Sequence, residues 1–144
     1  MLINIIITFS TFSIMEFVSW ATHKYVMHGF LWNLHEDHHK VDRNKIFQKN
    51  DYFFLIFAIP SFLLILFGSD KLDFKFFIGI GIALYGLAYF IIHEIIIHQR
   101  IPFLKNTKIK YFRILRKAHK IHHKIITKKG CSCFGMLIVP KKYW

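Results

Sequence analysis

The sequence is poor in the residues that build cross-links, loops and acidic surfaces. Its 144 residues include only two cysteines, three prolines, seven glycines and eight acidic residues. Cys131 and Cys133 form a lone C-x-C, a weak metal signal, and we interpret them as structural or incidental thiols that stay reduced in the cytoplasm. So few prolines and glycines leave no room for a low-complexity linker. The length then predicts one domain over residues 1–144.

Apolar residues, by contrast, are abundant. The chain is 54% hydrophobic and 18% aromatic, with a mean hydropathy of +0.36. Three long apolar runs account for this, at about residues 2–21, 52–68 and 76–92. At about 1.5 Å per helical residue, each is near the length that crosses a ~30 Å hydrocarbon core. The sequence therefore predicts an all-α integral membrane protein with three, or at most four, helices in the bilayer.

Positive charge is missing from one end of the chain and concentrated at the other. Residues 1–15 contain no Lys or Arg, so the basic region of a secretory signal peptide is lacking and the first run is expected to be a retained span. Five Lys and Arg lie between the first two runs, two between the second and third, and thirteen after the third. The positive-inside rule then puts the N-terminus outside and residues 22–51 and 93–144 in the cytoplasm.

The net charge of +12 is explained by this topology together with attraction to anionic lipid. The sequence contains no pattern of a nucleic-acid-binding module, so we expect no nucleic-acid partner. Residues 109–126 place apolar side chains at helical spacing among Arg and Lys. This predicts a basic amphipathic helix on the inner leaflet, although a basic helix packed on its own domain has the same pattern.

All ten histidines fall in four short motifs. An H-x4-H pair at the end of a predicted span is followed by an H-x2-HH motif, and this order occurs twice. The ten are His23, His28, His35, His38, His39, His93, His98, His119, His122 and His123. With the predicted topology all four motifs reach the cytoplasmic face of the membrane, where one metal site can collect them.

The spacing within the motifs has consequences for geometry. On an α-helix, residues i, i+3 and i+4 share a face, so His35, His38 and His39 are expected to point in one direction. The motif at residues 119–123 repeats this pattern. The i, i+5 pairs at 23/28 and 93/98 share no face of a regular helix. They converge only if the helix end unwinds or bulges, unless two metals take one histidine each.

The number of histidines favours two metal ions. Neutral imidazole suits Fe, Zn, Cu or Ni, but a zinc site uses only three or four protein ligands. Ten histidines fit two five- or six-coordinate ions completed by water or oxygen. Two iron ions at a lipid interface have a clear use, the activation of O2 to attack an unreactive C–H bond. We therefore expect two non-haem Fe ions with O2 as co-substrate, and no catalytic side chain beyond the metal centre.

Three acidic residues lie close to the motifs. Glu16 is inside the first span, two helical turns before His23, and a charge there is a functional hypothesis by default. Glu94 is one helical turn before His98, and Glu36 follows His35. Each of the three is expected to accept the second ring N–H of a ligand histidine and to fix its tautomer. For Glu16 and Glu94 the alternative is a hydrogen-bonded packing role.

Two other site classes use the same residues. The run from His35 and Glu36 to His39 satisfies H-E-x-x-H, the zinc-peptidase helix in which Glu is the general base. Its counterpart has Lys120 where that Glu should be, and a peptidase leaves most of the other histidines unexplained. A metal transporter is the non-enzymatic alternative. Three spans are few for a transport pathway, and no histidine falls in the middle of a span.

The motifs and their neighbours resemble the bacterial β-carotene hydroxylases of the fatty acid hydroxylase/sterol desaturase superfamily. The similarity extends from about residue 15 to the C-terminus. H-x4-H and H-x2-HH mark the superfamily, and the context Met-His-Gly-Phe-Leu-Trp points to the carotenoid branch. The matching stretches are EFVSWATHKYVMHGFLW at 16–32, HEDHH at 35–39, HEIIIH at 93–98, AHKIHH at 118–123 and FGM at 134–136.

The resemblance implies a di-iron enzyme of the bacterial inner membrane that hydroxylates carbon 3 of the β-ionone rings of a carotenoid, turning β-carotene into zeaxanthin. All ten histidines match family positions, which implies that each is a metal ligand. Electrons are expected from NAD(P)H through a ferredoxin-type carrier, an acidic partner that the basic cytoplasmic face can dock. The alternative is hydroxylation or desaturation of a fatty acyl chain or a sterol by the same metal centre.

Overall fold

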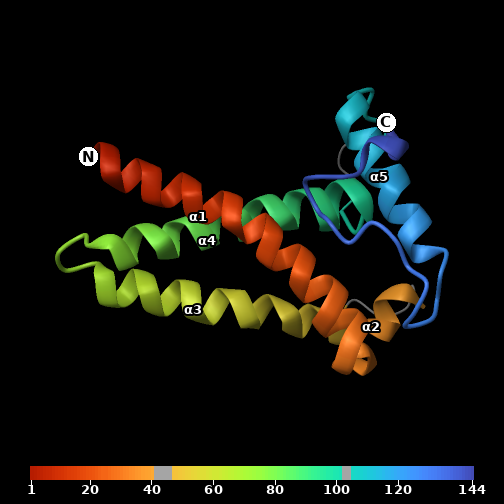
Figure 1. Cartoon of the computed structure of the whole chain (residues 1–144), viewed down its shortest axis with the longest axis horizontal. Helices are drawn as coiled ribbons and strands as arrows, with labels where there is room; N and C mark the ends of the chain where they lie inside the picture. The colour runs from red at the N-terminus through yellow and green to blue at the C-terminus, as the bar shows by residue number, and fades with distance from the viewer. Residues whose placement is uncertain (41–46, 102–104) are drawn as a thin grey trace.

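A computed structural model of the chain describes residues 1–40, 47–101 and 105–144, which contain helices and no strands (Figure 1). The first membrane helix is α1 (Leu2–Ala21), followed directly by the π-helical turns of η1 (Thr22–Phe30), which are kinked at Gly29. The other elements in chain order are α2 (Trp32–His39), η2 (Lys49–Tyr52), α3 (Phe53–Gly68), α4 (Phe74–Tyr89), η3 (Phe90–Ile97), α5 (Lys110–His123) and η4 (Lys141–Tyr143).

Three of these helical segments are long and apolar enough to cross a membrane. They cover Leu2–Phe30, Lys49–Gly68 and Phe74–Ile97 within the described residues. The prediction of three membrane helices is thereby confirmed. Each segment is longer than the apolar run that predicted it, because irregular turns extend it toward the histidine motifs: η1 after α1, η2 before α3 and η3 after α4. The second run, short in the sequence, gains its length from η2.

Helix α4 lies between α1 and α3 and packs against both. Two glycines on α4 make this possible. A Cβ at Gly79 would lie 2.9 Å from the Ser61 carbonyl oxygen of α3, and a Cβ at Gly81 would lie 2.7 Å from the Thr8 carbonyl oxygen of α1. Such small residues let membrane helices approach closely. The Ser61 hydroxyl adds a hydrogen bond of 2.8 Å to the Gly79 carbonyl.

The outer surface of the three long helices is apolar. Phe9 on α1, Phe62 on α3 and Leu87 on α4 are all more than half exposed. Exposed side chains of this kind suit helices surrounded by lipid, where the backbone hydrogen bonds are satisfied within each helix.

The chain's apolar core lies at one end of the bundle, under α5. Ile114, Leu115 and Ala118 of α5 are buried there, in one cluster with Ile96 of η3 and Met136 of the C-terminal segment. The predicted amphipathic helix is therefore present. Its apolar face packs on the protein instead of facing the inner leaflet, which corrects that part of the prediction. The same end gathers α2, the end of η3 and the C-terminal segment (Figure 1).

Candidate metal centre

Both H-x4-H pairs lie on π-helical turns. In η3 the backbone N–H of His98 donates to the carbonyl of His93, five residues earlier, at 2.8 Å. In η1 the N–H of Leu31 donates to the carbonyl of Val26 at 3.0 Å, again five residues apart. An i→i+5 bond widens the turn, so that residues five apart lie one above the other. A bulged helix end is one of the two possibilities that the spacing left open, and here it brings the two histidines of each pair into one group.

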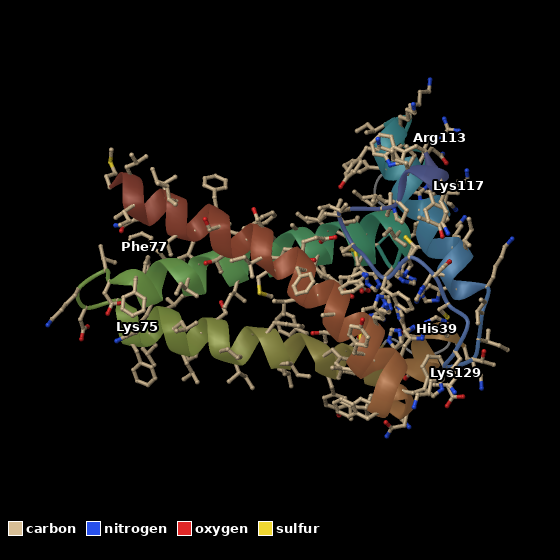
Figure 2. All side chains as sticks on the ribbon, viewed as in Figure 1. His39, Lys75, Phe77, Arg113, Lys117 and Lys129 are labelled. Atoms are coloured by element: carbon tan, nitrogen blue, oxygen red, sulfur yellow. The ribbon has the colours of Figure 1, made fainter. Side chains whose placement is uncertain are left out.

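The histidines converge in two adjacent groups at this end of the bundle, where nitrogen atoms gather around the labelled His39 (Figure 2). Within each group, one possible ligand atom per residue lies within 4.8 Å of all the others. We call these groups the first and second cluster. The first cluster contains His23, His28, His35, His39 and His122. The second cluster contains His38, His93, His98 and His119.

His123 stands beside the second cluster. Its Nε2 lies 2.8 Å from Nε2 of His119, and its ring stacks on that of His39 with centroids 4.4 Å apart. It therefore touches both groups and is the ligand candidate nearest their boundary. With it, the structure brings all ten predicted histidines together.

The H-x2-HH motifs do not behave as single units. Each π-helical pair stays within one cluster, but His38 and His39 belong to different clusters, as do His119 and His122. The expectation that each triplet points in one direction is therefore wrong. Successive residues of an α-helix are about 100° apart around its axis, and i+3 and i+4 fall on opposite sides of i. Helices α2 and α5 each run between the clusters and serve both.

The Nδ1 atoms of the first cluster all have oxygen partners. Because a carbonyl oxygen can only accept, each Nδ1 is the protonated nitrogen and each Nε2 carries the lone pair that a metal needs. Four of the acceptors are backbone carbonyls between residues 125 and 134. The pairs are His23 with Phe134 at 3.0 Å, His28 with Lys128 at 3.2 Å, His39 with Ile125 at 2.8 Å, His122 with Ser132 at 2.9 Å, and His35 with the side-chain oxygen of Asn50 at 2.6 Å.

The Nε2 atoms face one another at short distances. In the first cluster the separations are 3.2 Å for His23–His35 and 3.1 Å for His28–His39. Two lone pairs this close repel unless a cation lies between them. Two nitrogens bound at about 2.1 Å and at right angles to one ion are about 3.0 Å apart, whereas tetrahedral angles require about 3.4 Å. The spacing of these pairs is close to the right-angle value of a five- or six-coordinate ion.

The second cluster is oriented by side chains. Nδ1 of His38 donates to Oε1 of Gln48 at 2.8 Å, and Nδ1 of His93 donates to Oε1 of Glu94. The other oxygen of Glu94 pairs with Nε of Arg100 at 2.8 Å. Nε2 of His38 is buried without a hydrogen-bond partner among the described residues. Buried polar atoms are rarely left so, and a metal ion at the centre of the cluster would satisfy this one.

Burial also keeps these imidazoles neutral. Removal from water lowers the pKa of His35 to about 2, that of His122 to about 3 and that of His39 to about 4. The neighbouring imidazoles lower these pKa values further, because a second positive charge in the cluster is unfavourable. At neutral pH these three histidines are therefore in the neutral form that binds transition metals.

Of the three carboxylates expected to orient histidines, only Glu94 does so. Glu36 pairs with Lys40 at 2.6 Å on the outer side of α2. This also removes the general base of the zinc-peptidase alternative, since the carboxylate points away from His35 and His39. Glu16 binds the C-terminal segment instead of a histidine. Seven residues separate it from His23, about 10 Å along the helix, which is beyond the reach of its side chain.

Sequence reasoning missed the amides and the backbone carbonyls that orient the rings. Gln48 and Asn50 had a detectable signal, since they are polar residues placed just before an apolar span. The carbonyls of residues 125–134 gave no signal in the sequence, because every residue has a carbonyl group. Only the path of the folded chain determines which carbonyls face a histidine.

A cavity of about 980 Å³ lies between α1, α3 and α4 and reaches the first cluster. Its lining is mostly apolar and includes Met15, Phe57 and Tyr85. His23 forms part of the wall at the metal end. Phe54 and Phe62 line it as well and are mostly exposed, so the cavity opens on the apolar surface of the bundle.

Three helices fit to span a membrane, two histidine clusters that could hold metal ions and an apolar cavity between the helices define an integral membrane protein with a candidate metal site. The chain belongs to the fatty acid hydroxylase family, whose model matches residues 8–139. It is therefore an enzyme of the oxygenase type, as the sequence predicted.

Several curated relatives carry more specific names. The chain is 40% identical over 137 residues to a beta-carotene hydroxylase of Pantoea ananas, covering 95% of this chain and 78% of the relative. It is 34% identical over 136 residues to a beta-carotene hydroxylase of Paracoccus sp. (strain PC1), covering 94% and 83%. A chloroplastic beta-carotene 3-hydroxylase of an Oncidium hybrid cultivar is 38% identical over 113 residues, 76% of this chain and 37% of the relative. No solved structure matches the chain.

Proposed function

We propose that this protein hydroxylates carbon 3 of carotenoid β-ionone rings, converting β-carotene to zeaxanthin, with two iron ions and O2. The observation that carries the proposal is the apolar cavity that leads from the lipid-facing surface to His23 in the first cluster. The names of the relatives support the choice of a carotenoid.

The two clusters are the proposed iron sites. The first cluster supplies five nitrogens to one ion, and the second supplies four to the other, with His123 beside it. Bound iron supplies the activation of O2, a chemistry that side chains alone do not provide. One oxygen atom of O2 is inserted into the ring C–H bond. The other is reduced to water by two electrons from the donor and two protons. The protein's own tasks are to hold the ions, orient the ring and exclude water.

The cavity suits one end of a long lipid-soluble molecule. Its volume of about 980 Å³ is at the upper end of small-molecule sites, enough for a cyclic end group and part of the attached polyene. The rest of a C40 carotenoid would remain in the bilayer, which the cavity faces between α1 and α3. Polar groups are few in its wall, so shape and apolar contact position the ring beside the first cluster.

The electron donor is proposed to dock on α5. Four exposed cations lie on this helix and a fifth directly follows it, namely Lys110, Arg113, Lys117, Lys120 and then Lys124. Arg113 and Lys117 project away from the bundle (Figure 2). The opposite face of α5 carries His119 and His122, so a docked carrier is one helix thickness from the ligands. An acidic ferredoxin-type protein that passes on electrons from NAD(P)H fits this surface. Its position implies a cytoplasmic site, with the N-terminus outside the inner membrane of a bacterium.

The first test is pigment analysis of a bacterial host that makes β-carotene, with and without this protein at matched membrane expression. New mono- and di-hydroxylated carotenoid is the expected result. Unchanged β-carotene, with iron-loaded protein in the membrane, would contradict the carotenoid and direct the search to acyl chains or sterols. Zinc instead of iron in active protein would contradict the di-iron centre.

A substitution inside the cavity tests the substrate path separately. Gly86 of α4 lines the cavity, and a Cβ placed there meets no atom within 4 Å. We expect Gly86→Phe to fill the cavity and to stop carotenoid turnover while the iron content stays at the wild-type value. Leu84→Phe is the matched control, since Leu84 is exposed on α4 outside the cavity lining. Equal activity of both variants would show that the ring enters elsewhere.

A further inference from the structure

A buried carboxylate on α1 binds the C-terminal segment. Glu16 is 8% exposed, and its Oε1 accepts the backbone N–H groups of three successive residues: Met136 at 3.0 Å, Leu137 at 2.9 Å and Ile138 at 2.9 Å. Its Oε2 accepts the hydroxyl of Tyr85 on α4 at 2.7 Å. A carboxylate within a membrane helix is costly and is kept where it has specific partners. Here all its partners belong to one turn and one tyrosine.

The turn that Glu16 holds is tight and is also tied to α5. A Cβ at Gly135 would lie 2.4 Å from the carbonyl oxygen of Ile138, so only glycine allows the chain to close there. The Tyr111 hydroxyl donates to the Leu137 carbonyl at 2.7 Å. Residues 135–138 are thus held by α1 and α5 directly, and by α4 through Glu16.

The same turn directly follows carbonyls that orient the first cluster. Phe134 accepts from His23 and Ser132 accepts from His122, and both lie within a few residues of the three amides. We propose that Glu16 is a positioning residue for the metal of the first cluster. By fixing residues 135–138 against α1, it sets the carbonyls of Ser132 and Phe134 at the distance that keeps His23 and His122 aimed at the ion.

This inference rests on the proposed two-metal centre and goes beyond it by predicting a selective effect. The second cluster takes its described Nδ1 partners, Gln48 and Glu94, from the residue just before η2 and from η3, and not from residues 125–138. Loss of the Glu16 anchor therefore weakens metal binding in the first cluster and spares the second. A residue needed only for folding would affect both clusters alike.

The test uses the full chain purified in detergent and titrated with 57Fe(II) alone, with Mössbauer spectra to separate the two ions. His23→Ala and His93→Ala provide the reference spectra that lack the first and the second ion. We expect Glu16→Leu to weaken iron binding about 10- to 100-fold, as for other groups that orient ligands, and to lose the component that His23→Ala loses. Glu16→Gln, which keeps one oxygen acceptor, should lose the same component to a smaller extent.

Hydrogen exchange at the amides of Met136, Leu137 and Ile138 reports whether their hydrogen bonds to Glu16 have opened. The matched control is Glu36→Gln, which changes a carboxylate outside the two clusters. Faster exchange with selective loss of the first ion supports the proposal. Faster exchange with both ions retained, or equal loss of both ions, overturns it. If Glu16→Leu does not fold, Glu16→Gln decides by the same criteria. Wild-type protein that binds no iron would contradict the proposed function itself.

Discussion

The two histidine clusters are similar in composition but are held in place differently. Each receives a π-helical pair from a membrane helix, and both share α2 and α5. In the first cluster four of the five Nδ1 partners are backbone carbonyls of residues 125–134. In the second the described partners are the side chains of Gln48 and Glu94. The first cluster therefore depends on the path of a distant segment, and the second on single residues that a substitution can remove.

The difference also concerns charge. The first cluster is surrounded by neutral acceptors, whereas the second has a carboxylate against His93 and a guanidinium beyond it, at Arg100. A carboxylate that accepts the ring N–H makes the imidazole a stronger donor to a metal. The two ions are thus expected to differ in affinity and in electronic properties, which the following substitutions test in order of decreasing effect.

The largest effect is expected from neighbouring histidines on α5. His119→Ala and His122→Ala should each reduce hydroxylated carotenoid below detection, because both ions are needed. The two variants should lose different ions, since His119 belongs to the second cluster and His122 to the first. Pigment analysis and metal content of the purified proteins are the measurements. If both variants lost the same ion, the division into two clusters would be wrong.

Asn50 is the side-chain exception in the first cluster. Asn50→Leu removes the acceptor at 2.6 Å from Nδ1 of His35, and we expect iron affinity of the first cluster to fall by about 10- to 100-fold. Asn50→Asp keeps an oxygen at the same place and should retain most of the affinity. The measurement is iron titration of both variants. Equal affinity of the Leu variant and the wild type would mean that the backbone carbonyls alone orient this cluster.

A smaller effect is expected from Glu94→Gln in the second cluster. Glutamine still offers an oxygen to Nδ1 of His93 but loses the charge that pairs with Arg100. Iron affinity of the second ion should fall by about tenfold, the low end of the range for such partners, with the first ion unaffected. Titration followed by Mössbauer spectroscopy checks this. A change confined to the first ion would contradict the assignment of Glu94 to the second cluster.

The smallest effect is expected from Glu36→Gln, because the Glu36–Lys40 pair lies at the surface of α2. Exposed pairs four residues apart on a helix contribute less than about 0.5 kcal/mol. Turnover and metal content should therefore match the wild type. If the hydroxylase activity of Glu36→Gln fell as far as that of Asn50→Leu, Glu36 would orient a ligand histidine after all.

The sequence by itself determined the membrane helices and the gathering of the histidine motifs at one end of them. Apolar run lengths, charge distribution and the H-x4-H spacing are local properties, so they predicted three spans and one common end for all four motifs. For each i, i+5 pair they left two possibilities, a distorted helix end or two metals that take one histidine each. Glu94 was found for the same reason, since its partner is the adjacent His93.

Only the tertiary structure decided how the ligands are divided and what holds them. His38 and His39 are neighbours in the chain but face different clusters, because each is turned about 100° from the next around α2. The acceptor of His23 lies 111 residues away at Phe134, and the backbone partners of Glu16 lie 120 to 122 residues away. Contacts of this kind depend on how α1, α5 and the C-terminal segment pack together, and no local pattern of residues carries that information.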